Sequence, residues 1–298
     1  MKIWIENNSL AGRTDEFLWP GALYGLKRLL EAGYELSAEP DKLTEQQYQL
    51  LENELIRFSS FKMEEAGAVV RRNDKKGSLD LWVGHEPVAG GHDWIELTQN
   101  FLFPSRKASQ HRKTSETDIR ISLNIDGSGI SNIQTGLNFL DHMLEQIARH
   151  GLIDLNIQCK GDLEIDEHHT IEDVAITLGK TLYEACGRDK TGIQRYGFLL
   201  AMDESQAEVA LDLSNRPYLV WDGTFDREYV GDFPLEMTEH FFHTLAMNLK
   251  ATLQIRVVGK NDHHKIEAIF KGFAKALRFA VTRTERTRGI LPSSKGEL

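Results

Sequence analysis

The chain contains the stretch HHTIED at residues 168–173 and the related stretch HHKIEA at residues 263–268. Both read His-His-x-x-Glu, and each leads into apolar residues at helical spacing. On a helix, residues four apart share one face, while neighbours point about 100° apart. His168 and Glu172 can therefore hold one metal ion, whereas His169 must serve another. The corresponding residues of the second stretch are His263, Glu267 and His264. The two stretches therefore indicate a paired-metal arrangement.

Both stretches belong to a longer repeat. Each follows an amphipathic helix that opens with an acidic residue and a histidine, at residues 141–142 and 239–240. Each helix is followed by an alternating strand, at residues 155–161 and 253–259. A hairpin is expected before each helix, formed by residues 119–125 with 130–135 and by residues 207–213 with 218–222.

This order predicts one supersecondary unit that occurs twice, in residues 115–200 and 201–290. We therefore expect an internally duplicated α+β domain, with sheets on one side and helices on the other. A lone histidine on a helix is more often structural or exposed than a metal ligand. Chance does not readily place the same acid and histidine pattern in both halves of a duplication. Imidazole combined with carboxylate suits divalent Mn, Fe, Co, Ni or Zn rather than Mg or Ca.

From about Arg112 to Leu298, the chain resembles the imidazoleglycerol-phosphate dehydratases, lyases of histidine biosynthesis. The motifs that carry this resemblance are residues 139–144 (FLDHML), 168–173 (HHTIED), 203–204 (DE), 212–217 (DLSNRP), 239–242 (EHFF), 260–264 (KNDHH) and 291–296 (LPSSKG). The resemblance implies two Mn ions per site, an active site shared between subunits, and a homo-oligomeric cage of 24 subunits. It also implies the metal ligands His142, His168, His169, Glu172, His240, His263, His264 and Glu267.

The implied reaction removes a proton from an unactivated carbon and expels hydroxide. Metal ions at both ring nitrogens would favour an imidazolate, which assists that loss. Glu116 is the candidate acid and base, because it matches the acidic residue of a family segment, here residues 115–117. The alternative for Glu116 is a solvated charge at the start of a strand. The predicted catalytic residues are Glu116, His142, Glu172 and Glu267.

A phosphate substrate requires cations and hydroxyls. The resemblance implies these contacts from Arg195, Arg216, Lys271, Ser293, Ser294 and Lys295. Guanidinium groups match the geometry of a phosphate, and hydroxyls with an ammonium complete the site. Taken singly, each cation can equally be a surface charge.

Composition restricts the remaining possibilities. The 298 residues are 41% hydrophobic, with a net charge of −10, which argues against a nucleic-acid partner. No apolar run reaches membrane-spanning length and no signal segment opens the chain. Two cysteines do not suggest a disulfide framework, so we expect a soluble cytoplasmic protein of two domains.

The first of those domains, residues 1–110, resembles a degenerate haloacid-dehalogenase-type phosphatase. The strand at residues 2–5 leads to Glu6 and Asn8, where that superfamily has two aspartates. Asparagine cannot transfer the proton, and a longer glutamate would misplace the nucleophile. We therefore expect a small, non-catalytic α/β domain. The alternative is an unrelated α/β domain with accidental similarity.

Residues 111–298 are accordingly predicted to form a metal-dependent lyase. One alternative is a non-catalytic metal-binding assembly protein, which would need the histidine clusters but not the phosphate contacts. Another is a bifunctional enzyme with residual histidinol-phosphate phosphatase activity.

Overall fold

The computed structural model describes all residues except 12–16, 188–189, 285, 288 and 297–298. The chain forms two compact units, Met1–Pro104 and Ser105–Leu298. The boundary lies ahead of the position expected at residue 110, because that residue is inside strand β6 (Lys107–Lys113). Strand β6 pairs along its whole length with β7 (Thr117–Asn124), which fixes β6 within the second unit.

The first unit is built on a five-stranded sheet of order β2-β1-β3-β4-β5. Its strands are β1 (Lys2–Ile5), β2 (Glu35–Ser37), β3 (Ala68–Asn73), β4 (Ser78–Val83) and β5 (Glu86–Gly91). Its helices are α1 (Asn7–Leu10), α2 (Ala22–Glu31), α3 (Glu45–Asn53) and α4 (Trp94–Leu102), with 3-10 turns at Pro40–Lys42 and Met63–Glu65. Strand β1 pairs in parallel with β2 and β3, so this region has the expected α/β character.

The second unit contains the duplication. Its first half is β6, β7, β8 (Ser131–Gln134), α5 (Asn138–Gly151), β9 (Asp154–Gly161) and α6 (Glu167–Cys186). Its second half is β10 (Tyr196–Met202), β11 (Ser205–Asp212), β12 (Tyr218–Asp222), α7 (Glu236–Leu249), β15 (Thr252–Val258) and α8 (Asp262–Val281). A short hairpin, β13 (Tyr229–Val230) with β14 (Phe233–Pro234), is inserted before α7.

The expected hairpins are wrong. The two sheets have the orders β6-β7-β9-β8 and β10-β11-β15-β12, so β9 separates β7 from β8 and β15 separates β11 from β12. Strand β8 is parallel to β9, and β12 is parallel to β15. Parallel neighbours need a crossover connection, which the helices α5 and α7 provide. The first strand of each half, β6 and β10, is also absent from the elements expected from the sequence.

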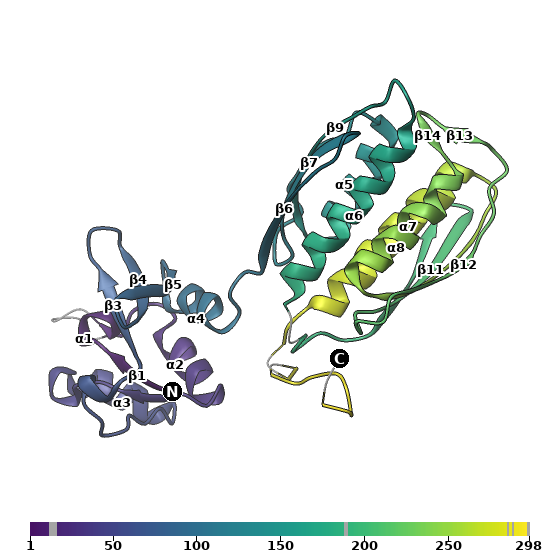
Figure 1. Ribbon diagram of the computed structural model, residues 1–298. Coiled ribbons are helices and arrows are strands. Elements are labelled where there is room, and N and C mark those ends of the chain that lie inside the picture. The colour runs from purple at the N-terminus through teal and green to yellow at the C-terminus, as the bar shows by residue number, and fades with distance from the viewer. Residues whose placement is uncertain (12–16, 188–189, 285, 288, 297–298) are drawn as a thin grey trace. The chain divides into compact units, whose positions relative to one another are not determined.

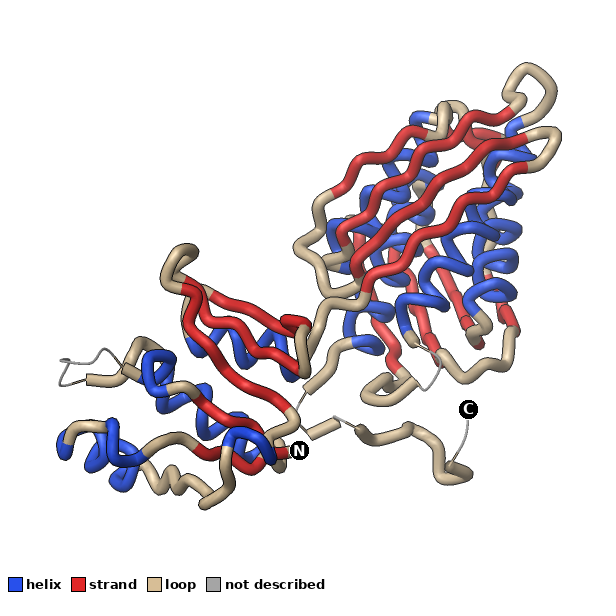
Figure 2. The backbone as a smooth tube through the Cα atoms, turned by 60° about the vertical axis from the view of Figure 1, so that its left-hand side comes forward, coloured by secondary structure: helices blue, strands red, loops and turns tan. Residues whose placement is uncertain are grey.

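The four helices of this unit lie between its two sheets, as Figures 1 and 2 show. Helices α5 and α6 cover the first sheet and α7 and α8 cover the second. Helix α5 packs on α8, and α6 packs on α7. The α+β class is confirmed, but the helices have a sheet on each side because the two halves pack helix against helix. No described helix is long and apolar enough to cross a membrane.

Candidate metal centres

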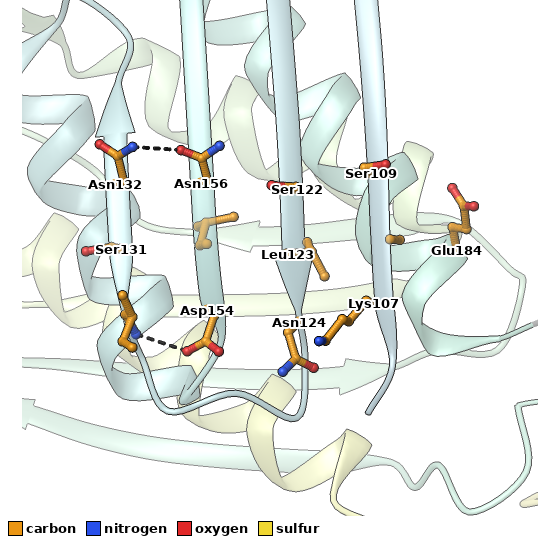
Figure 3. Close-up of a pocket in the computed structure, with 13 residues that line it drawn as sticks. Lys107, Ser109, Ser122, Leu123, Asn124, Ser131, Asn132, Asp154, Asn156 and Glu184 are labelled. Carbon is orange, nitrogen blue, oxygen red and sulfur yellow. Dashed lines mark hydrogen bonds between the residues drawn. The ribbon is translucent and has the colours of Figure 1, made fainter. Parts of the chain in front are cut away.

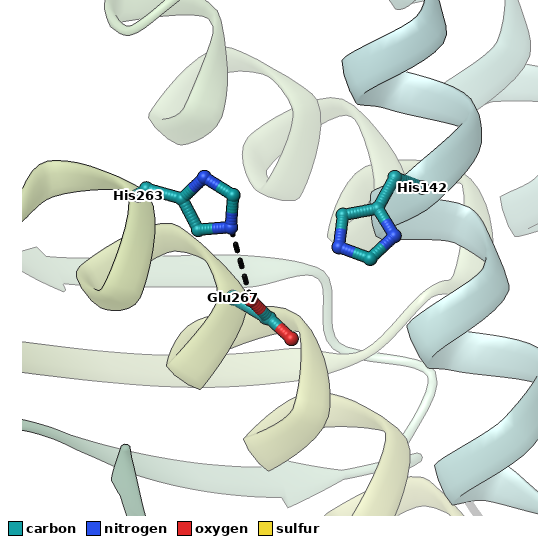
Figure 4. A group of neighbouring side chains, drawn as sticks. All are labelled: His142, His263 and Glu267. Atoms are coloured by element: carbon teal, nitrogen blue, oxygen red, sulfur yellow. Dashed lines mark hydrogen bonds and ion pairs between the residues drawn. The ribbon is translucent and has the colours of Figure 1, made fainter. Parts of the chain in front are cut away.

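The first histidine cluster joins α5 to α8. It consists of His142 from α5 with His263 and Glu267 from α8, whose ligand atoms all lie within 4.8 Å of one another. The Nε2 atom of His263 is 3.1 Å from Oε2 of Glu267. Figure 4 draws this interaction as a dashed line and shows His142 facing the pair from α5. His263 and Glu267 are four residues apart, so they share the helix face that meets α5.

The second cluster repeats this arrangement between α6 and α7. It contains His168 and Glu172 from α6 and His240 from α7, again within 4.8 Å. The Nε2 atom of His240 is 3.4 Å from Oε1 of Glu172, and Nε2 of His168 is 3.8 Å from Oε2. Each cluster therefore combines the acid-His helix of one half with the His-His-x-x-Glu helix of the other half.

His169 and His264 lie outside both clusters. The Nδ1 atom of His169 is 3.2 Å from Asp162, and its Nε2 atom is 4.0 Å from Glu116. The Nδ1 atom of His264 is 2.8 Å from Glu204. The hydrogen bond with Asp162 raises the pKa of His169, and the bond with Glu204 raises the pKa of His264. A carboxylate that accepts from Nδ1 fixes the ring and leaves Nε2 for a metal ion.

Sequence reasoning missed the orienting roles of Asp162 and Glu204. One available signal was the duplication itself, because Glu116 and Glu204 each precede the first residue of an equivalent strand, β7 and β11. Glu116 also lies beside His169, and Glu204 beside His264, which is the second histidine of the His-His pair in each half. Asp162 has no such counterpart in the second half, where Lys260 follows Gly259.

The donor set fits divalent transition ions. Each cluster offers two imidazoles and one carboxylate, which such ions accept. The Nε2 atom of His240 is buried, and although the Glu172 carboxylate lies 3.4 Å away, it makes no hydrogen bond with any described residue. A buried ring nitrogen without a hydrogen bond is unfavourable unless something else binds it.

Lys271 lies beside the first cluster. Its Nζ atom is 2.7 Å from Oε1 of Glu267, one turn away on α8. Burial would raise the pKa of Glu267, but the hydrogen bond and charge of Lys271 outweigh that effect and hold the pKa below its usual value. The structure therefore separates Lys271 from the other expected phosphate residues and places it where it keeps Glu267 ionised.

Those other residues do come together. A cavity of about 480 Å³ is lined by all five of them: Arg195, Arg216, Ser293, Ser294 and Lys295. Asp212 accepts a hydrogen bond from Nε of Arg195 at 2.7 Å, and its Oδ2 atom lies 3.9 Å from Nη2 of Arg216. We call this group the cationic cavity.

The cationic cavity lies far from the first cluster of the same chain. The backbone N–H of Gln194, next to Arg195, donates to the carbonyl of Ala280. Ala280 is seventeen residues after His263 on α8, which corresponds to about 25 Å at the helical rise. One small substrate cannot contact both groups within a single chain.

A hollow of about 640 Å³ lies on the outer face of the first sheet, shown in Figure 3. It is lined mainly by short polar side chains, including Ser109, Ser122, Asn132 and Asn156. The amide of Asn132 donates to Asn156 across neighbouring strands at 2.9 Å. No histidine of either cluster lines this hollow, so it is separate from the metal centres.

The first unit has its own cavity, of about 480 Å³, at the carboxyl end of β1. Glu6 and Asn8 line it, at the point where a parallel sheet usually binds ligands. Oε1 of Glu6 is held by Nε of Arg71 at 3.0 Å, and Asn7 exchanges hydrogen bonds with the backbone of Glu39. No second carboxylate stands at position 8 to transfer a proton.

The fold, the two histidine–carboxylate clusters and the cationic cavity together define a candidate metalloenzyme, and the comparisons name its family. The model of the imidazoleglycerol-phosphate dehydratase family matches residues 135–277. The chain is 46% identical over 276 residues to the histidine biosynthesis bifunctional protein HisB of Spirosoma linguale, covering 92% of this chain and 71% of that protein. The chain belongs to the imidazoleglycerol-phosphate dehydratase family, and is thus a lyase of histidine biosynthesis.

Further relatives agree with this assignment. The chain is 54% identical to the bifunctional HisB protein of Actinobacillus pleuropneumoniae, over 69% of its own length and 58% of that protein. It thus spans little more than half the length of some curated relatives. The imidazoleglycerol-phosphate dehydratase structure from Staphylococcus aureus is 37% identical with a TM-score of 0.55, over 60% of this chain and 99% of that one. The Pyrococcus furiosus structure is 33% identical with a TM-score of 0.54, over 63% and 100%.

Proposed function

We propose that this chain dehydrates D-erythro-imidazoleglycerol phosphate to imidazole-acetol phosphate, with two divalent metal ions, most suitably manganese, per site. The observation that carries the proposal is the presence of two clusters of identical composition, each built between the two halves of the duplication. An imidazole ring has two nitrogens, and two such clusters offer one metal ion to each. A protein that only bound metal would not need the cationic cavity.

The six clustered side chains would hold the ions, with His169 and His264 supplying further ligands. Bound at the substrate ring, divalent ions supply Lewis-acid stabilisation of negative charge. The protein contributes the arrangement of the ligands. Asp162 and Glu204 orient the two further histidines, and Lys271 keeps Glu267 in its charged form.

The substrate would bind between two copies of the chain. The cationic cavity lies at the far end of α8 from His263, and about 25 Å exceeds the length of a three-carbon phosphate on one ring. His169 and His264 also belong to neither cluster of their own chain. A homo-oligomer accounts for both observations, because a neighbouring copy can supply the cationic cavity and the further histidines that one chain does not bring to its own clusters. The 24-subunit cage implied by the family resemblance is such an assembly.

Proton transfer is assigned to Glu116. Its carboxylate is 4.0 Å from Nε2 of His169, so it stands next to a predicted metal ligand. It is also half-exposed, which leaves it accessible to a substrate. Arg195 and Arg216 would bind the phosphate, aided by Ser293, Ser294 and Lys295. These bonds hold the reacting carbon in place for Glu116.

The first unit is proposed to be non-catalytic. Its cavity holds Glu6 in an ion pair with Arg71, and Asn8 occupies the position that requires an acid. The match to the Spirosoma linguale protein covers 92% of this chain, so it extends into this unit. We therefore regard the unit as a relic of a phosphatase domain rather than a second enzyme.

A dehydratase assay tests the proposal. The purified chain would be stripped of metal with a chelator and supplied with imidazoleglycerol phosphate, with and without Mn²⁺. We expect turnover only with the metal ion, and a ratio of two ions per chain at saturation. Metal binding without turnover would favour the non-catalytic alternative, and turnover by the stripped protein would contradict the metal-dependent reaction.

A further inference from the structure

The two halves of the duplication differ in the connection before their acid-His helices. In the first half, β8 ends at Gln134 and α5 begins at Asn138. In the second half, β12 ends at Asp222 and α7 begins at Glu236. The added residues, 223–235, contain the hairpin of β13 and β14. We call them the bridging segment, because they contact the amino ends of the other three helices that carry clustered histidines.

The beginning of the bridging segment is fixed to α8. The Oδ2 atom of Asp262 accepts from the backbone N–H groups of Asp226 at 3.0 Å and Arg227 at 2.9 Å. Lys265 donates to the carbonyl of Thr224 at 2.8 Å. Asp262 and Lys265 form an almost fully buried ion pair at 2.6 Å. They flank His263 and His264, so this end of the segment is attached to the turn that presents both histidines.

The next contact is with α5. Helix α5 has no side-chain cap from its own N-cap residue, Leu137. Asp232 supplies one instead, because its carboxylate accepts from the backbone N–H of Asn138 at 2.6 Å and of Phe139 at 2.9 Å. His142 lies one turn further along α5. The segment therefore joins α8 to α5, the two helices of the first cluster.

A second set of contacts joins α6 to α7. The hydroxyl of Tyr229 donates to Oε1 of Glu167 at 3.2 Å, next to His168. The segment then runs directly into α7, which carries His240. It consequently also joins the two helices of the second cluster.

Aromatic packing connects the segment to a histidine ring. Phe233 of β14 is fully buried and packs against Phe139, with ring centroids 5.8 Å apart. The ring of Phe139 in turn meets the ring of His263 at 5.2 Å, edge to face. Such pairs favour a defined ring orientation. The position of His263 is thus supported both by the backbone and by side-chain packing.

We propose that the bridging segment is a positioning element that sets the distances between the helices of each cluster, with Asp232 governing the first cluster and Tyr229 the second. This inference rests on the proposed function, in that the clusters are taken to bind metal. Asp232 and Tyr229 touch neither metal ligands nor substrate. They act through Asn138, Phe139 and Glu167.

The test is a Mn²⁺ titration of the full chain after metal removal, with free Mn²⁺ followed by its electron paramagnetic resonance signal. The variants are Asp232→Ala, Asp232→Asn and Tyr229→Phe. The matched control is Asp154→Ala, because Asp154 also accepts backbone N–H bonds, from Ser128, Gly129 and Ile130, but holds no histidine-bearing helix.

Asp232→Ala should raise the Kd of one of the two ions by about 10-fold, as loss of an orienting contact does in metal sites. Asp232→Asn should recover part of that loss, because its amide oxygen still accepts an N–H bond. Tyr229→Phe, which removes one exposed hydroxyl and leaves the fold intact, should weaken the other ion by a smaller factor. Asp154→Ala should bind both ions as the unaltered chain does.

Two results would overturn the inference: normal Mn²⁺ affinity in both Asp232→Ala and Tyr229→Phe, or an equal loss in Asp154→Ala. If Asp232→Ala does not fold, the Tyr229→Phe titration decides the question alone. Failure of the proposed function looks different. An unaltered chain that binds Mn²⁺ but converts no substrate overturns the proposed function alone, and one that binds no Mn²⁺ overturns both proposals.

Discussion

The clustered histidines and the histidines that directly follow two of them have different surroundings, although they are neighbours in sequence. His168 and His263 face a carboxylate on their own helix and a histidine on another. His169 and His264 face the carboxylates Asp162 and Glu204 instead. This division follows from the angle of about 100° between successive helical residues. It is also the part of the site that the sequence predicted best, because it depends only on helical geometry.

Removing one clustered histidine should remove one ion. We expect His263→Ala to lower the metal content to about one ion per chain, because the first cluster then loses one of its three ligands and binds a divalent ion weakly. Activity should fall with the metal. Elemental analysis of the purified variant measures this loss. His243→Ala is the control, since His243 is an exposed histidine on α7 outside both clusters. Two tightly bound ions in His263→Ala would contradict the ligand assignment.

Asp126 provides a pH-dependent contribution to stability. Burial would raise its pKa, but hydrogen bonds and charge from Arg106, followed by the charge of Arg283, hold the pKa below its usual value. A depressed carboxyl pKa stabilises the fold above the unfolded pKa of about 3.9, and this contribution is lost as the pH falls through the lower folded value. Asp126→Asn should therefore unfold at a lower temperature at pH 7. The difference from the unaltered chain should close below about pH 4. A pH-independent difference in thermal unfolding would contradict this account.

At the scale of elements, helices could be predicted more reliably than strand pairing. Helices α6 and α8 begin one residue before the two His-His-x-x-Glu stretches, because apolar spacing and capping are local properties. Strand neighbours depend on contacts distant in sequence, and β9 lies between β7 and β8 only because α5 carries the chain across the sheet. The alternation of apolar and polar residues within one strand does not show which strand pairs beside it. The hairpins were therefore predicted wrongly from correctly placed strands.

The buried pair at the start of α8 offers a test at this scale. Lys265→Met would leave the carboxylate of Asp262 buried without its cation, at a cost of about 3–5 kcal/mol. The double variant Asp262→Asn with Lys265→Met should recover much of that stability, because neither charge remains. Denaturant unfolding of the two variants measures the difference. Equal destabilisation in both would show that the ion pair is not what supports this turn.

At the scale of the whole molecule, the second unit contains every predicted ligand and phosphate contact. Its hydrophobic core includes residues from both halves, and no described residue of the first unit belongs to that core. A chain beginning at Ser105 should therefore remain soluble, assemble and retain dehydratase activity. An insoluble or monomeric product would instead assign the first unit a structural role in assembly. Size-exclusion chromatography with light scattering distinguishes these outcomes.

The full chain should also show no magnesium-dependent release of phosphate from histidinol phosphate, because Glu6 is paired and Asn8 carries no acid. Phosphate release that Glu6→Ala abolished would contradict this.

The cationic cavity illustrates what the sequence could not supply. Its residues were individually predicted from the family resemblance, but their separation from the first cluster appears only when Gln194 is seen beside Ala280.

In the proposed shared site, one substrate meets the clusters of one copy and the cationic cavity of another. Mixing two inactive proteins tests whether the site is shared. His263→Ala loses a cluster but keeps the cavity, while Arg216→Ala with Lys295→Ala loses the cavity but keeps both clusters. The two would be unfolded, mixed, refolded together with Mn²⁺ and assayed for dehydration of imidazoleglycerol phosphate. Shared sites predict that mixed assemblies regain activity far above either protein refolded alone, because some sites combine an intact cluster with an intact cavity. A mixture as inactive as its components, despite confirmed co-assembly, would contradict the account.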